Sequence, residues 1–170
     1  MDLLEVRMAK TFAKESALFI PSESMANLVA VMTHCGNRGS EVLLGDKSSI
    51  FNNAQGGLSQ LGGVQTRTLP NARDGTISVD SLKESITQDP SLGLVTDLIA
   101  VENTHRAGGM VLPDGYIESL AYMAGKRNIP VHVDGARIWN AAVFMRQPLS
   151  YVTAHADTVT ACLSRGLGAP

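Results

Sequence analysis

The sequence lacks the long apolar segments of membrane proteins and is poor in cysteine. No apolar run approaches the roughly 20 residues that a membrane-spanning helix needs. The first ten residues carry charges of both signs, which the apolar core of a secretory signal would exclude. The two cysteines, Cys35 and Cys162, have no metal-binding spacing and favour reduced thiols. These absences predict a cytoplasmic protein.

Sequence motifs that would assign several common functions are also missing. The net charge is −2, with no basic cluster and no aromatic-rich stripe, so nucleic-acid binding is not indicated. The sequence contains no GxGxxG, GxxxxGK(S/T) or GxSxG motif, which argues against a dinucleotide-binding Rossmann domain, a P-loop and a serine hydrolase. Its aspartate, glutamate and histidine residues are too scattered to predict a metal site.

The remaining composition is that of an ordinary globular domain. With 170 residues, of which 44% are apolar and 18% charged, the chain can bury one core. Short apolar runs alternate with amphipathic segments, which predicts an α/β fold: a three-layer, mostly parallel sheet with helices on both faces. The predicted strands are 17–20, 41–45, 64–69, 98–101, 131–134 and 158–163. The predicted helices are 2–16, 23–35, 79–88, 113–125 and 149–154, with Ser22 and Ser78 as N-caps.

The stretch from Pro130 to Arg137 is the first candidate for a functional centre. It reads Pro-Val-His-Val-Asp-Gly-Ala-Arg, a buried strand followed by a turn toward a helical segment. In parallel α/β sheets the ligand crevice lies outside the carboxyl ends of the strands, which is where Asp134 and Arg137 fall. By itself this pair is also typical of a structural ion pair, so the functional interpretation depends on other blocks of the sequence.

Three blocks together resemble a known enzyme family. They are His-Val-Asp-Gly-Ala-Arg at 132–137 with Asn-Ala-Ala at 140–142, Glu-Asn-Thr-His at 102–105 with Gly-Gly at 108–109, and Cys-Leu-Ser at 162–164 with Gly-Leu-Gly-Ala-Pro at 166–170. In their residues and in their order along the chain, the blocks resemble the threonine aldolases, lyases of the pyridoxal-phosphate (PLP) family with the aspartate-aminotransferase fold. The resemblance runs over nearly the whole chain and over about half of a family member. It implies that residues 1–170 form a single, partial large domain and that the C-terminal small domain is absent.

The resemblance also implies roles for residues at the expected sheet edge. Asp134 matches the carboxylate that keeps the pyridine nitrogen of PLP protonated, and Arg137 matches the guanidinium that binds the substrate carboxylate. His105 lies in a family block at the end of a strand, which implies a catalytic ancestry. A histidine at such a position is also typical of an ordinary loop residue.

The expected phosphate site departs from the family pattern. Ser22, Glu23 and Ser24 occupy a predicted helix start, where free N–H groups favour an anion, but the family has a glycine in place of Glu23. A carboxylate about 4 Å from a phosphate would cost roughly 4 kcal/mol per charge pair at an effective dielectric near 20. The same residues could also simply cap a helix.

Three further positions depart from the family. Ser49 replaces a histidine that stacks on the cofactor ring, and Ala54 replaces a glutamate. Arg165 occupies the position of the lysine that forms the Schiff base with PLP. Because a guanidinium stays protonated, it cannot form that bond.

The resemblance therefore predicts both an activity and its loss. Threonine aldolases cleave L-threonine or L-allo-threonine to glycine and acetaldehyde with PLP, and the expected substrate class is a small amino acid. The altered positions predict a catalytically impaired fragment. Two alternatives stay open: an active lyase completed by another chain, and a non-catalytic subunit-binding module. A homo-oligomer, or association with a full-length relative, is expected through exposed apolar surface.

Overall fold

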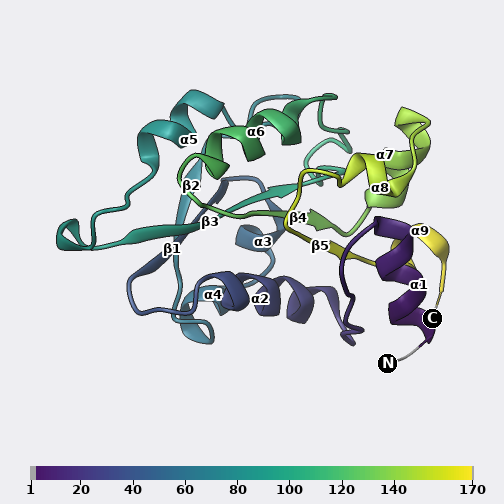
Figure 1. Cartoon of the computed structure of the whole chain (residues 1–170), viewed down its shortest axis with the longest axis horizontal. Helices are drawn as coiled ribbons and strands as arrows, with labels where there is room; N and C mark the ends of the chain where they lie inside the picture. The colour runs from purple at the N-terminus through teal and green to yellow at the C-terminus, as the bar shows by residue number, and fades with distance from the viewer. Residues whose placement is uncertain (1–2, 170) are drawn as a thin grey trace.

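The computed structural model of the chain describes residues 3–169, which fold around one five-stranded sheet (Figure 1). Every neighbouring pair of strands is parallel, in the order β2-β1-β3-β4-β5. The strands are β1 (Ser40–Gly45), β2 (Gln65–Leu69), β3 (Val95–Glu102), β4 (Val131–Gly135) and β5 (Thr158–Ala161). Parallel strands need crossover connections, and helices supply them here.

Helices cover both faces of the sheet, as predicted (Figure 1). One face is covered by α2 (Glu23–His34) and α4 (Gly57–Gln60). The other is covered by α5 (Val79–Ser85), α6 (Tyr116–Gly125), α7 (Ile138–Met145) and α8 (Leu149–Val152), with Phe12 of α1 (Leu3–Phe12) in the same core. The remaining elements are α3 (Ser49–Asn52), the 3-10 turn η1 (Pro90–Leu92) and α9 (Leu163–Leu167). None of the helices within residues 3–169 is long and apolar enough to cross a membrane.

Alternation along β4 places its polar residues on the α2 face. Val131 and Val133 belong to the core under α5–α8. Successive side chains of a strand point to opposite faces, so His132 and Asp134 point toward α2. All four side chains are buried. The strand thus carries an apolar face for packing and a buried polar face that must find hydrogen-bond partners.

Three helix boundaries differ from prediction by three or more residues, two of them beside a residue in the left-handed conformation. The first helix ends at Phe12 instead of residue 16, and Ala13 follows with φ 51°. Its expected start at Asp2 lies outside the described residues. The helix expected from Pro113 begins at Tyr116, because its N-cap, Gly115, has φ 76°. The helix expected to end at residue 88 ends at Ser85, since the next residue is extended.

Two strand predictions are also wrong. Residues 17–20 form no strand, since they pair with none of the five strands. The last strand ends at Ala161 and not at residue 163. Cys162 is instead the N-cap of α9, a helix that the sequence did not predict. Beta-branched residues at 158–160 favour a strand, but the Gly-Leu-Gly run that follows allows the chain to turn into a short helix.

Candidate functional site

Two buried carboxylates lie side by side at the carboxyl edge of the sheet. In the parallel register, Glu102 at the end of β3 pairs with Asp134 on β4. The exposed fractions of Glu102 and Asp134 are 2% and 0%. A buried charge needs hydrogen-bond donors or a counter-charge. The hydrogen-bond donors around each carboxylate therefore show how its buried charge is stabilised.

Asp134 accepts one hydrogen bond on each carboxylate oxygen. The Asn27 side-chain amide donates to Oδ2 across 3.0 Å, and the Ala136 backbone N–H donates to Oδ1 across 3.1 Å. Burial, followed by the neighbouring Glu102 charge, raises the pKa of Asp134 to about 6, although both hydrogen bonds and the Arg137 charge lower it. The carboxyl group therefore changes its charge in mildly acidic solution.

Asn27 connects α2 to both β4 and β5, a role that the sequence did not reveal. Its Oδ1 accepts from the Thr160 hydroxyl at 2.8 Å and lies 3.3 Å from His132 Nε2. The other ring nitrogen of His132 lies 2.9 Å from the Thr158 hydroxyl. Burial, with a smaller contribution from His34, lowers the pKa of His132 to about 3, so the ring is neutral at neutral pH. A neutral ring that donates through Nε2 and accepts through Nδ1 satisfies all of these contacts.

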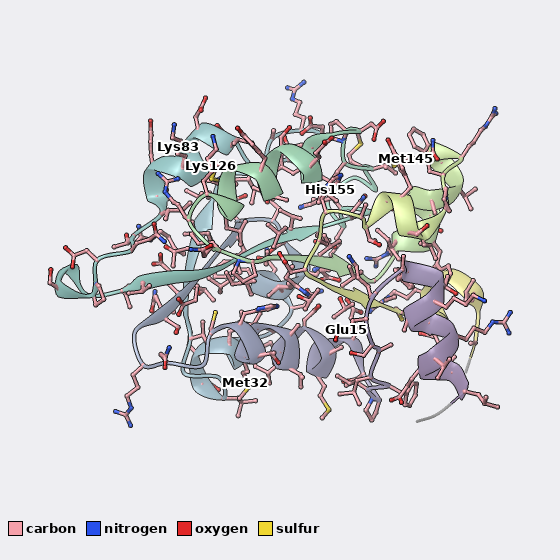
Figure 2. All side chains as sticks on the ribbon, viewed as in Figure 1. Glu15, Met32, Lys83, Lys126, Met145 and His155 are labelled. Atoms are coloured by element: carbon pink, nitrogen blue, oxygen red, sulfur yellow. The ribbon has the colours of Figure 1, made fainter. Side chains whose placement is uncertain are left out.

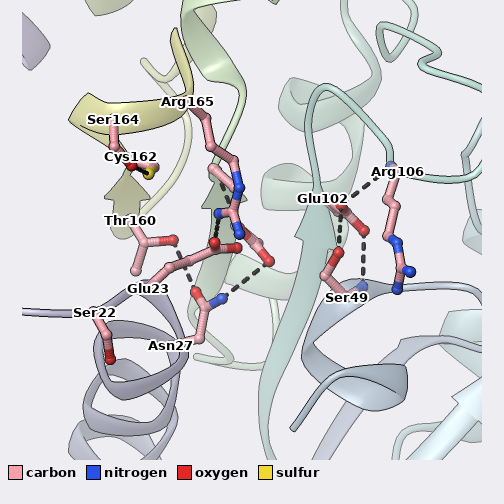
Figure 3. Close-up of polar contacts among 12 residues, drawn as sticks. Ser22, Glu23, Asn27, Ser49, Glu102, Arg106, Thr160, Cys162, Ser164 and Arg165 are labelled. Atoms are coloured by element: carbon pink, nitrogen blue, oxygen red, sulfur yellow. Dashed lines mark hydrogen bonds and ion pairs between the residues drawn. The ribbon is translucent and has the colours of Figure 1, made fainter. Parts of the chain in front are cut away.

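Glu102 holds the start of α3 in place. Its carboxylate accepts from the Ser49 N–H at 2.9 Å, the Ser49 hydroxyl at 2.8 Å and the Arg106 N–H at 3.1 Å (Figure 3). Ser49, where the family pattern has a ring-stacking histidine, therefore donates its hydroxyl hydrogen to Glu102. A serine has no aromatic face, so the position offers no stacking partner to a ring.

His105 is buried and lies outside the cavity described below. Its Nδ1 accepts from the Ala107 N–H at 3.2 Å, and its Nε2 has no hydrogen-bond partner within residues 3–169. The ring packs against Gly75, where an added Cβ would approach the His105 Cβ to 2.8 Å. The catalytic ancestry of His105 stays a prediction.

Arg137 does not form the structural ion pair that the sequence left open. Over the described part of the chain, the ion pairs are Arg67 with Glu41 and Arg165 with Glu23. The half-buried Arg137 instead forms the N-cap of α7, and its carbonyl accepts from the Thr104 hydroxyl at 3.2 Å. Its charge still acts on Asp134, because it lowers the pKa of that carboxyl group.

A cavity of about 380 Å³ opens between α2, α3, α4 and α9. Of the predicted site residues it brings together Glu23, Ser24, Ser49 and Arg165, and it is also lined by Ala54. The other predicted residues, Ser22, His105, Asp134 and Arg137, are not among those lining it. The rest of its wall combines five apolar side chains with three amides and a glycine: Met25, Leu28, Ile50, Leu58, Leu61, Asn27, Asn53, Gln55 and Gly57.

The charged groups at this cavity pair with each other. Glu23, the first residue of α2, forms an ion pair with Arg165 of α9 (Figure 3). The two side chains meet near Asn27, which lies one turn further along α2 and holds Asp134. Ser22 is the N-cap, and its hydroxyl accepts from the Met25 N–H at 3.3 Å. The prediction that Ser22 caps this helix is confirmed.

Comparison with known proteins identifies the family and the fold. The model of the family described as beta-eliminating lyase matches residues 1–170. The chain belongs to the beta-eliminating lyase family. This lyase family member is 44% identical to a probable low-specificity L-threonine aldolase 2 of Arabidopsis thaliana, over 98% of this chain and 48% of that protein. It is 38% identical to the low specificity L-threonine aldolase of Escherichia coli K12, over 100% of this chain and 50% of that protein.

Solved structures show the same fold. A putative L-allo-threonine aldolase from Listeria monocytogenes superposes with a TM-score of 0.83 at 24% identity, over 96% of this chain and 44% of that one. A Leishmania major threonine aldolase gives a TM-score of 0.77 at 17% identity. This lyase family member spans about half the length of the curated relatives it matches. The predicted family, and the fold of its PLP-dependent members, are thus confirmed.

The cavity residues of this lyase family member do not fit covalently bound PLP. Attachment of that aldehyde requires a lysine amine, and none of the chain's lysines lines the cavity. Lys83 and Lys126 lie on the opposite side of the sheet from α2 (Figure 2). The ammonium group of Lys14 donates to the carbonyls of Thr153 and Ala156. Asp134, which the resemblance assigns to the ring nitrogen of PLP, is fully buried and does not line the cavity, so its cofactor role stays a prediction.

Proposed function

We propose that this chain is a threonine-aldolase-like large-domain segment that does not catalyse aldol cleavage by itself. Family membership and 44% identity to a probable threonine aldolase support the ancestral activity, cleavage of a small β-hydroxy amino acid to glycine and an aldehyde. The loss is supported by one observation: Arg165 faces the cavity, pairs with Glu23, and no lysine lines the same space.

The absence of a lysine at the cavity explains why aldol-cleavage activity would be lost. Carbon–carbon cleavage next to an amine needs an electron sink, and in this family PLP would supply it once joined to the substrate amine. A lysine of the protein would hold the cofactor aldehyde before the substrate takes its place. Arginine carries a delocalised guanidinium and not an amine, so no neutral amine is present at position 165. The paired guanidinium can bind an anion, but it cannot attack an aldehyde.

Completion by another chain is the second candidate, supported by exposed apolar side chains. Leu3 on α1 and Val143 and Phe144 on α7 are between 76% and 87% exposed. Apolar side chains at such positions suit contact with a further protein surface. Self-association and binding to a full-length relative both remain proposals.

Threonine cleavage in solution tests the proposal. The purified chain is incubated with PLP and L-threonine or L-allo-threonine, and glycine and acetaldehyde are measured. We expect no rate above that of free PLP, while a full-length relative in the same assay gives a clear rate. Glycine formation by the chain alone, abolished by Asp134→Asn, would contradict the proposal. A rate that emerges only after mixing with a full-length relative, beyond the relative's own rate, would favour the second candidate.

A further inference from the structure

We infer that the carboxylate of Glu23, paired with Arg165, occupies the phosphate end of the cavity. As a result, this chain does not bind phosphate esters through their phosphate group. This inference rests on the proposed function, since it assigns the cavity to the ancestral cofactor. It concerns a different defect, however. The missing lysine prevents a covalent bond, whereas Glu23 would prevent even non-covalent binding of a phosphorylated ligand.

The position of Glu23 supports this role. It is the first residue of α2, a helix of 12 residues, where the helix dipole and free N–H groups favour a negative charge. No acceptor for the backbone N–H groups of Glu23 and Ser24 lies within residues 3–169. The Glu23 side chain is 16% exposed, so its carboxylate lies largely inside the site. The Glu23 carboxylate thus places a negative charge beside the start of α2, although it accepts no hydrogen bond from these N–H groups.

Arg165 completes the charge balance. Its guanidinium comes from α9, beyond the end of β5, and reaches across to α2 (Figure 3). One positive and one negative charge at this end of the cavity sum to zero, so an incoming phosphate gains no net attraction from these two side chains. The phosphate would have to displace Glu23 from Arg165 and then lie beside the displaced carboxylate. Without the Glu23 charge, Arg165 and the start of α2 would together form an anion site.

Binding of pyridoxamine 5′-phosphate tests this inference without any covalent chemistry. This probe has no aldehyde, so its binding does not depend on a lysine. Its dissociation constant is measured by titration calorimetry next to that of pyridoxamine, which lacks the phosphate. For the wild-type chain we expect the phosphate to improve affinity by less than about fivefold. In Glu23→Gln, which removes the charge but keeps the size, we expect a gain of at least about tenfold for the phosphorylated probe alone.

Matched variants complete the experiment. Glu84→Gln removes an exposed carboxylate from α5 on the other face of the sheet, and we expect it to match the wild type. Glu23→Ser provides a second way to remove the charge if Glu23→Gln does not fold by circular dichroism. The inference is overturned if the wild-type chain prefers the phosphorylated probe by fivefold or more. It is equally overturned if folded Glu23 variants gain nothing. Neither result depends on glycine formation. The binding titrations therefore test the role of Glu23, and the glycine assay tests the proposed function independently.

Discussion

At the scale of single residues, Asn27 determines how the buried carboxylate of Asp134 is held. The amide oxygen of Asn27 faces donors from His132 and Thr160, so its amide nitrogen must face Asp134. An amide donor in this place favours the ionised form of Asp134, while burial favours the neutral form. Burial has the larger effect, and the pKa of Asp134 is raised to about 6.

This raised pKa predicts how stability changes with pH. Because the folded chain binds a proton at Asp134 that the unfolded chain has already lost, the Asp134 contribution to the free energy of unfolding falls as pH rises from about 4 to about 6. Asp134→Asn removes that titration. We expect the free energy of unfolding of the variant, relative to wild type, to increase by about 2–3 kcal/mol between pH 4 and pH 7.5.

Urea unfolding of both proteins at several pH values measures this difference. The His132 titration, which acts in the opposite direction because its folded pKa is lowered to about 3, is common to both proteins and largely cancels. A difference that is the same at pH 4 and pH 7.5 would contradict the burial argument. Above about pH 7 the curve of the difference should be flat.

Sequence patterns could predict the residues at strand ends, but not what those residues contact. The position of Asp134 at a strand end could be predicted because a β-branched run ends on this carboxylate. The position of Glu23 could be predicted because it comes directly after the predicted N-cap of a helix. Asn27 was missed because a single asparagine inside an amphipathic helix carries no signal until β4 and β5 are known to lie beneath it. The interaction of Ser49 with Glu102 was missed for the same reason, since 53 positions separate them in the chain.

At the scale of elements, α9 is positioned by Trp139 of α7. The indole N–H donates to the Cys162 carbonyl at 3.1 Å, immediately before α9 begins. The indole also packs edge-on against Phe12 of α1, with ring centroids 5.8 Å apart. Gly166 lies directly against the Trp139 side chain, where an added Cβ would be 2.8 Å from Cγ. Three helices therefore meet at one tryptophan, and α9 carries Arg165 to the cavity from there.

Gly166→Ala tests this arrangement. The added methyl group must displace either Trp139 or α9, and overpacking of this kind costs about 1–3 kcal/mol. We expect a lower midpoint of thermal unfolding and faster amide hydrogen exchange in residues 163–169. Gly125→Ala at the end of α6 is the control, because its Cβ meets nothing within 4 Å and alanine favours a helix. Equal midpoints for the two variants would show that α9 is not held by this contact.

Element types were easier to predict than element ends. The five strands of the sheet each overlap a predicted strand, because β-branched runs flanked by turn residues mark them clearly. The short helices α3, α4 and α9 were missed, since four or five residues are too few to show a helical period. The composition of the apolar run at 17–20 predicts a strand, but the run has no partner strand in the sheet.

At the scale of the whole molecule, we propose that the fold of the family is kept while its cofactor chemistry is not. The described residues form a five-stranded parallel sheet with a core on each face, and the similarity to solved threonine aldolase structures covers 88% or more of the chain. In the proposed account, the cavity lacks two groups that covalent PLP requires, because Arg165 stands in place of an amine and Glu23 lies at the expected anion site. A sheet is stabilised by its buried side chains, so it can persist when cavity residues change.

Borohydride reduction of Arg165→Lys with PLP tests this separation most directly. Reduction fixes any lysine–PLP bond, and peptide mass spectrometry reports labelling at position 165 relative to the exposed Lys10. We predict that the single variant is labelled at position 165 no more than at Lys10, because Glu23 and Ser49 still do not fit the cofactor. Adding Glu23→Gly and Ser49→His should raise labelling at position 165 several-fold. Strong, selective labelling in Arg165→Lys alone would contradict the account and would mean that one residue separates this chain from an intact cofactor site.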